Sequence, residues 1–261
     1  MKKLIIASAI LLAVSVNAQV GNIAVGKKIQ MFTESKGANT VSMMGQEMEI
    51  PSTAKTTSEI EVKSVTTDAI TATITLKRIA ASTNIMGQEN SFDSDEKPTS
   101  NNPMAAALLK NLNKPQDVVL EKGKIRGKTD IGITGVPTSN EVAKKLFLAV
   151  DVANIKEGFK WTEQADGEGT KTNTIYTITK VTTTDIEVTA TSSIKIEATI
   201  NQMGMDMKQN ISGSVVSVSV YDAATMLLKA DATKMDLSGT IQIMGNDAPM
   251  SVKLITTTTV K

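Results

Sequence analysis

The sequence predicts a mainly β protein whose antiparallel, curved sheet or sheets form a half-barrel or a sandwich-like arrangement. Apolar and polar residues alternate with a period of two in most segments. Thr accompanies Val and Ile in these segments, and short turn motifs separate them. Such alternation is typical of antiparallel strands with one buried and one solvated face. The pattern does not distinguish one curved sheet from two packed sheets.

The expected strands lie on both sides of the middle of the chain. Their alternating cores are residues 60–63, 70–77, 175–178, 186–188, 194–196, 216–220, 241–243 and 251–260. In each core we expect the apolar positions to face the interior and the Thr, Ser and charged positions to face water. Residues 118–126 predict a further hairpin that turns near Lys122 and Gly123.

Two stretches of the chain match each other. The pattern Ile60-x-Val62-x-x-Val65-Thr-Thr-Asp68 returns as Tyr176-x-Ile178-x-x-Val181-Thr-Thr-Thr-Asp185, and a Met-Gly pair follows each Asp after 18 residues. This repetition indicates an internal duplication. We therefore expect an N-terminal β half at residues 19–135, a helical connector at residues 136–155 and a C-terminal β half at residues 156–261.

A Met-Gly motif occurs four times. The four pairs begin at Met44, Met86, Met203 and Met244. We expect each glycine to occupy the first central position of a two-residue type II′ hairpin, which requires a positive φ. On this interpretation the methionines fill space on the apolar face.

Two short helices are expected between the strands. Asn102 can cap a helix that begins at Pro103 and ends before Pro115. Thr138 and Glu141 form a capping box for a second helix that extends to about Val150.

The first residues have the pattern of a secretory signal peptide. Lys2 and Lys3 precede a short apolar run, and Val16 and Ala18 supply small residues at the −3 and −1 positions. We expect residues 1–18 to be removed after Ala18 and the product to be periplasmic or secreted. Removal of the two lysines changes the formal net charge from +1 to −1. A charge this small does not favour nucleic acid or anionic lipid.

The composition argues against an enzyme. The chain contains no His and no Cys, so the common proton-transfer and thiol groups are absent and no disulfide stabilises the fold. A buried carboxylate pair in a cleft would be needed to restore an enzymatic hypothesis. We expect a non-enzymatic protein without a cofactor.

Three stretches imitate two known functional motifs. The stretch from Gly123 to Thr129 resembles a phosphate-binding loop but has one residue too few between its glycines. Ser52 with Lys55, and Ser192 with Lys195, match the Ser-x-x-Lys of penicillin-recognising enzymes. That chemistry requires a helix, whereas these pairs lie in expected strands or loops, where positions i and i+3 point to opposite faces.

Two metal hypotheses remain. Asp93, Asp95 and Glu96 suit Ca²⁺ chemically, but their spacing lacks the glycine and the final glutamate of an EF-hand, so a solvated loop is favoured. Met203, Met205 and Met207 alternate, and thioethers are soft ligands that suit Cu(I). We keep a Cu(I)-handling periplasmic protein as the alternative function.

The paired Val-Thr-Thr segments, the Met-Gly-Gln turns and the stretch from Gly158 to Trp161 resemble a family of exported β-rich proteins of the Bacteroidota. The resemblance spans roughly residues 26–260 and implies no catalytic residue. It also implies an architecture similar to the periplasmic lipoprotein carriers, whose curved sheets hold acyl chains on a concave face. We therefore expect an apolar ligand near Met44, Met86, Met203 and Met244, or an envelope protein as partner.

Overall fold

The computed structural model describes residues 23–43, 45–66, 68–96, 109, 111–121, 124–126, 136–167, 169–202, 205–243 and 246–261. For residues 43, 200–202, 205–207 and 243 only the backbone is described. The expected signal peptide lies outside these residues, as does nearly all of the helix expected from Pro103.

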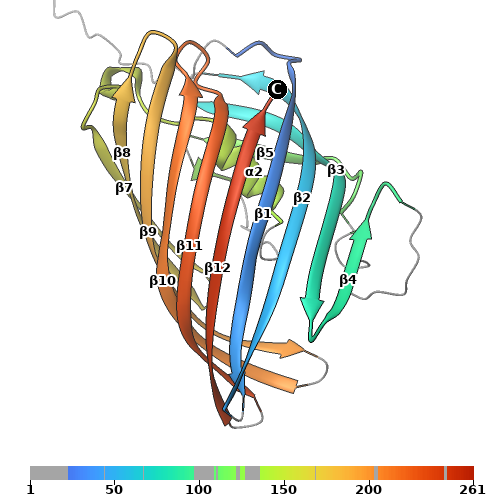
Figure 1. The fold of residues 1–261 in the computed structure, drawn as a ribbon. Helices are drawn as coiled ribbons and strands as arrows, with labels where there is room; N and C mark the ends of the chain where they lie inside the picture. Colours follow the sequence, from blue (N-terminus) through green and yellow to red (C-terminus); the bar gives the residue numbers. More distant parts are fainter. Residues whose placement is uncertain are drawn as a thin grey trace, which may run out of the picture.

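The described residues form one antiparallel sheet of 12 strands, and Figure 1 shows its curvature. The strands are β1 (Lys28–Met43), β2 (Gln46–Val65), β3 (Ala69–Ile85), β4 (Gln88–Asp93), β5 (Gln116–Glu121), β6 (Lys124–Ile125), β7 (Lys160–Gly167), β8 (Thr170–Val181), β9 (Asp185–Gln202), β10 (Met205–Asp222), β11 (Leu228–Ile243) and β12 (Asn246–Val260). Their order across the sheet is β6-β5-β3-β2-β1-β12-β11-β10-β9-β8-β7, with β4 paired to β3. The predicted mainly β, curved antiparallel fold is confirmed, with one open sheet in place of two packed ones.

The pairing of β1 with β12 joins the strands that precede the helical connector to those that follow it. Its register runs from Met31 opposite Val260 to Val41 opposite Met250. The strands before and after the connector therefore share a single sheet. The predicted hairpin at residues 118–126 is also present, because β5 pairs with β6.

Similar backbone contacts occur at the start of β1 and of β7. Gly26 N donates to Val62 O, and Gly158 N donates to Ile178 O, each over 2.8 Å. Both glycines have a positive φ, 82° and 83° respectively. This common geometry accompanies the sequence match, and the duplication itself stays a prediction.

The second predicted helix is present as α2 (Ser139–Leu146), followed by a 3-10 turn at Val152–Asn154. The predicted capping box is confirmed: Thr138 Oγ1 accepts from Glu141 N over 3.2 Å, and Thr138 N donates to Glu141 Oε2 over 2.8 Å. The helix ends earlier than Val150, because Phe147 is extended and bridges to Leu227. None of the described helices is long and apolar enough to cross a membrane.

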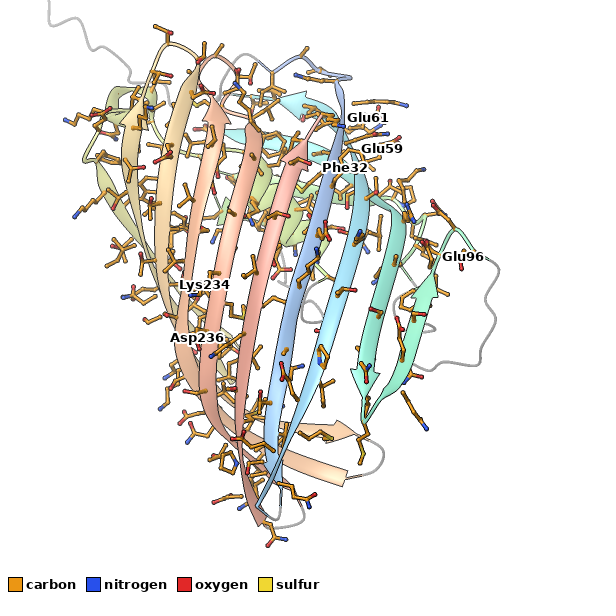
Figure 2. The ribbon with its side chains drawn as sticks, in the orientation of Figure 1. Phe32, Glu59, Glu61, Glu96, Lys234 and Asp236 are labelled. Atoms are coloured by element: carbon orange, nitrogen blue, oxygen red, sulfur yellow. The ribbon has the colours of Figure 1, made fainter. Side chains whose placement is uncertain are left out.

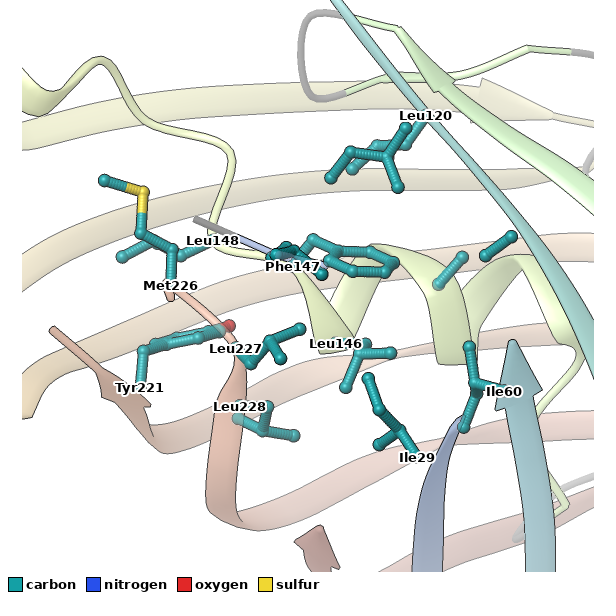
Figure 3. Close-up of a cluster of buried hydrophobic side chains, with 14 of the residues drawn as sticks. Ile29, Ile60, Leu120, Leu146, Phe147, Leu148, Tyr221, Met226, Leu227 and Leu228 are labelled. Carbon is teal, nitrogen blue, oxygen red and sulfur yellow. The ribbon is translucent and has the colours of Figure 1, made fainter. Parts of the chain in front are cut away.

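The sheet curves around α2, which packs on its concave side against β3, β5 and β6 (Figure 1). Leu146 is fully buried at the centre of this contact. Figure 3 shows the surrounding side chains, which include Ile29, Ile60, Leu120, Phe147, Tyr221 and Leu228. The helix thus covers one end of the concave face with apolar side chains.

A buried ion pair connects α2 to the sheet. Lys145 Nζ lies 2.5 Å from Asp231 Oδ2, with the Asp231 side chain fully buried and the Lys145 side chain 30% exposed. Ser219 Oγ and Thr233 Oγ1 donate to Asp231 over 2.7 and 2.9 Å. Tyr221 donates its hydroxyl to Lys145 O over 3.2 Å. The carboxylate therefore has both a countercharge and hydrogen-bond donors, as a buried charge requires.

The Met-Gly turns differ from the prediction. Ile85 pairs with Gln88, so Met86 and Gly87 are the two central residues, with φ of 53° and 82°. Two positive φ values are the signature of a type I′ turn, and the glycine occupies its second position rather than the first position of a type II′ turn. Asn84 Oδ1 accepts from Gly87 N over 2.9 Å and supports this turn.

The same spacing recurs at the other three motifs. The closing pairs are Met43–Gln46, Gln202–Met205 and Ile243–Asn246, each of which leaves a Met-Gly pair between the strands. Since alternate connections of an antiparallel meander lie at one end, all four hairpins close at the same end of the sheet.

Three glycines lie on the concave face where neighbouring strands approach closely. A Cβ at Gly37, Gly213 or Gly239 would lie 2.1 Å from a carbonyl oxygen of the adjacent strand. The side chains of Leu254 and Leu237 cover the first two of these positions. Glycine is therefore required here by close backbone approach, as at the bends of curved sheets.

Gly213→Ala should lower the free energy of unfolding by about 1–3 kcal/mol, because the new methyl group overlaps Asp236 O. Ser214→Ala on the exposed convex face is the matched control and should change it by less than about 0.5 kcal/mol. Denaturant unfolding measures both variants. An alanine variant as stable as the parent protein would contradict the close approach.

Asp231→Asn should destabilise the fold by about 2–3 kcal/mol, because Lys145 loses its countercharge while remaining largely buried. Asp236→Asn, on the exposed face of the same strand, serves as the control and should be nearly neutral. A double-mutant cycle with Lys145→Met isolates the coupling between the two groups. Additive effects in that cycle would argue against the ion pair.

Candidate functional site: the concave face of the sheet

The register aligns inward side chains of neighbouring strands in lateral rows, since directly opposite residues share a face. We call two adjacent rows near the middle of the concave face the hydroxyl belt. The upper row, nearer α2, contains Ser219, Asp231, Thr258, Thr33 and Thr56. The lower row, farther from α2, contains Ser217, Thr233, Thr256 and Ser35. The belt crosses β10, β11, β12, β1 and β2 and lies next to the core that α2 covers.

Hydrogen bonds between strands hold the belt together. Thr33 and Thr258 share a hydrogen bond of 3.3 Å, and Ser35 and Thr256 share one of 2.9 Å. Among the described residues, no buried side-chain nitrogen or oxygen lacks a partner. The upper row is buried, whereas Thr256 in the lower row is half-buried. The upper row therefore belongs to the buried core, whereas Thr256 in the lower row keeps part of its surface accessible.

Beyond the belt, apolar side chains dominate the next four rows, which we call the apolar field. Its apolar members are Val41, Met48, Ile50, Ile194, Ile196, Ala198, Ile211, Val215, Met235, Leu237, Ile241, Ala248, Met250, Val252 and Leu254. The polar members of the rows are Asn39, Ser52, Ser192 and Gln209. Most of the apolar side chains, Val215 and Leu254 among them, are only half-buried. The field is thus an apolar surface that keeps part of its area accessible.

Charge is distributed unevenly between the two faces. Figure 2 shows the convex face, where Glu59, Glu61, Lys234 and Asp236 point outward. In contrast, no described side chain of the apolar field is charged. The described charges on the concave side of β7 and β11 are paired with α2: Asp231 with Lys145, and Glu163 with Lys144 over 2.5 Å. Each of these two concave-side carboxylates therefore has a lysine of α2 as its countercharge.

Two tyrosines lie beside the helix. Tyr221 and Tyr176 each have a pKa raised above the ordinary value, chiefly because burial penalises the phenolate. Tyr176 donates to Glu163 Oε2 over 3.2 Å and stacks on Trp161 with ring centroids 4.8 Å apart. Both hydroxyls therefore act as neutral hydrogen-bond donors that fix α2 and its surroundings.

The sequence-predicted methionines are only partly visible. Met86 lies at its turn with a side chain that is 85% exposed. Met44, Met203 and Met244 lie outside the described residues, and Met205 and Met207 are described only as backbone of β10. Their role in apolar binding and the Cu(I) hypothesis both stay predictions.

The other motifs have structural explanations. Ser52 lies on the concave face of β2 and Lys55 is exposed on the convex face, so the predicted separation of the Ser-x-x-Lys pair is confirmed. In the candidate Ca²⁺ loop, Arg78 contacts Asp93 and Asp95 over 2.5 and 3.1 Å. Its guanidinium lowers the pKa of Asp93 and takes the place that a cation would occupy. Of the imitated phosphate loop, Gly123 and residues 127–129 lie outside the described residues.

Sequence reasoning missed the belt because it assigned the wrong face in β10. The alternation of Val216, Val218 and Val220 with serines predicted buried valines. Instead, Val216 and Val218 are 41% and 38% exposed on the convex face. Ser219 lies inward opposite Asp231 and is 7% exposed. The signal that could have revealed the belt was Asp231, because this charged residue lies on the same face of β11 as Met235 and Leu237.

Comparisons with known proteins support the fold. No protein-family model matches the chain, and no curated protein sequence matches it. A solved structure of lipovitellin, described in terms of lipid–protein interactions, matches with a TM-score of 0.53 and 10% identity. The match covers 91% of this chain and 25% of the lipovitellin chain. This chain therefore spans about a quarter of lipovitellin and is similar to it in fold.

Two further solved structures match with lower scores. An outer membrane lipoprotein-sorting protein domain from Vibrio parahaemolyticus has a TM-score of 0.19 and 7% identity, and the match covers 85% of this chain and 83% of that chain. A DUF1329 family protein from Desulfovibrio piger ATCC 29098 has a TM-score of 0.16 and 6% identity, with the same two coverages of 85% and 83%. Scores this low do not establish a common fold. The chain is thus similar in architecture to the matched part of lipovitellin, which is the relationship that the comparisons support.

Proposed function

We propose that this protein is a non-enzymatic, exported binding protein that holds an apolar, lipid-like ligand on the apolar field. The observation that carries the proposal is the set of half-buried apolar side chains, such as Val215, Val252 and Leu254, on the concave side of a curved sheet. Accessible apolar surface that is contiguous and bordered by polar groups is a common mark of ligand binding.

The dimensions of the apolar field suit a lipid tail. A strand rises about 3.3 Å per residue, so the stretch from Leu254 to Ala248 is about 20 Å long. One lipid tail spans about 15 Å, half of a hydrocarbon core about 30 Å thick. The six strands from β9 to β2 are about 24 Å wide at this level. The field therefore has room for more than one tail.

Other observations support the same class of function. Lipovitellin, whose structure is described for its lipid–protein interactions, is similar in fold. The signal-peptide pattern of residues 1–18 favours export, where a lipid-like molecule requires a carrier to cross an aqueous compartment. The absence of His and Cys from the sequence argues against the commonest catalytic groups and favours binding over chemistry.

Native mass spectrometry of protein purified from its own host, without refolding, tests the proposal. We expect an added mass of several hundred daltons that is lost on organic extraction. A bare chain mass, together with no uptake of added lipid, would contradict the proposal. An added copper ion that is lost on methionine oxidation would favour the Cu(I) alternative instead.

Two adjacent valines provide a matched pair of variants. Val215→Asp places a charge in the apolar field, whereas Val216→Asp places the same charge on the convex face. We expect the first variant to lose at least about tenfold in lipid affinity, because a carboxylate is costly to bury against an apolar tail. The second should bind as the parent protein does. Fluorescent-lipid titration measures both, with circular dichroism to confirm that each variant is folded.

A further inference from the structure

We infer that the ligand is an uncharged amphiphile, whose hydroxyl, ester or amide group contacts the lower row of the hydroxyl belt while its apolar chain lies along the apolar field. This inference rests on the proposed function and adds the chemical class of the ligand. The inference depends on one juxtaposition: Ser217, Thr233 and Thr256 lie directly beside the first apolar row, which contains Val215, Met235 and Leu254.

The position of the belt gives the first argument. Thr256 lies in the same strand as Leu254, two residues away and on the same face, so a polar group and an apolar chain would meet the protein within about 7 Å. In the lower row Ser217, Thr233 and Thr256 are half-buried, whereas Thr258 in the upper row is 2% exposed. A ligand on the field would therefore contact the hydroxyls of the lower row at its end nearest α2.

The absence of unpaired charge gives the second argument. Asp231 and Lys145 neutralise each other at the α2 end of the belt, and the described side chains of the apolar field carry no charge. A carboxylate or phosphate head group would lose its hydration without gaining a countercharge, which is unfavourable. A neutral polar group costs less to desolvate, and hydrogen bonds to the hydroxyls can replace those it loses to water.

The chemistry of the hydroxyls gives the third argument. Each Ser or Thr hydroxyl can donate one hydrogen bond and accept others, so it suits ligand groups of either kind. Thr256 already shares one hydrogen bond of 2.9 Å with Ser35, which orients it without using its full capacity. The belt therefore matches a hydroxyl, ester or amide better than an ion.

Competition between three probes of equal chain length tests the inference. The probes are monoolein, oleate at pH 8 and the hydrocarbon 1-octadecene, each measured by displacement of a fluorescent lipid. We expect monoolein to bind at least tenfold more tightly than oleate and more tightly than the hydrocarbon. Equal or tighter binding of oleate would overturn the inference and leave the proposed function intact. Failure of all three probes to bind would overturn both.

The Thr256→Val variant tests the role of the belt directly. It keeps the shape of the side chain and removes its hydroxyl, so the preference for monoolein over the hydrocarbon should fall about threefold to tenfold. Thr257→Val, the next residue on the exposed convex face, is the matched control and should keep the preference. An unchanged preference in Thr256→Val would overturn the assignment of this hydroxyl. If that variant fails to fold, the comparison of monoolein with oleate on the parent protein decides.

Discussion

The pairing of β1 with β12 is the contact on which the rest of the structure depends. It joins strands from the two sides of the chain in one uninterrupted register, from Met31 opposite Val260 to Val41 opposite Met250. Because of this register, hydroxyls from five strands lie in rows, and apolar side chains lie in further rows below them. Neither the hydroxyl belt nor the apolar field would be continuous in two separate sheets.

The two faces of the sheet are different chemical environments. Charged side chains such as Lys234 and Asp236 stand on the convex face, while the charges nearest the concave core are paired with α2. At Gly37, Gly213 and Gly239 neighbouring strands of the curved sheet approach too closely for a side chain. The concave surface therefore owes its shape to backbone packing and its polarity to the inward residue of each strand.

Local patterns predicted local structure well. The alternation of apolar and polar residues indicated the antiparallel strands, and Thr138 with Glu141 marked the start of α2. The same alternation gave the wrong face for Val216 and Val218, because the face of a strand is set by its register with its neighbours. The turn position of Gly87 also depends on register, as does the alignment of Ser219 with Asp231. Such long-range pairings are not encoded in any single segment.

The union of β1 with β12 also shapes how the chain folds. Thr33 and Thr258, which meet in this pairing, are separated by 225 residues. Closing so large a loop is entropically costly, and folds rich in such distant contacts form slowly. Until β12 has been made, β1 has an unpaired edge, and the apolar residues of the earlier strands lack part of their final surroundings. The chain is therefore expected to depend on protection from aggregation between its synthesis and the completion of the sheet.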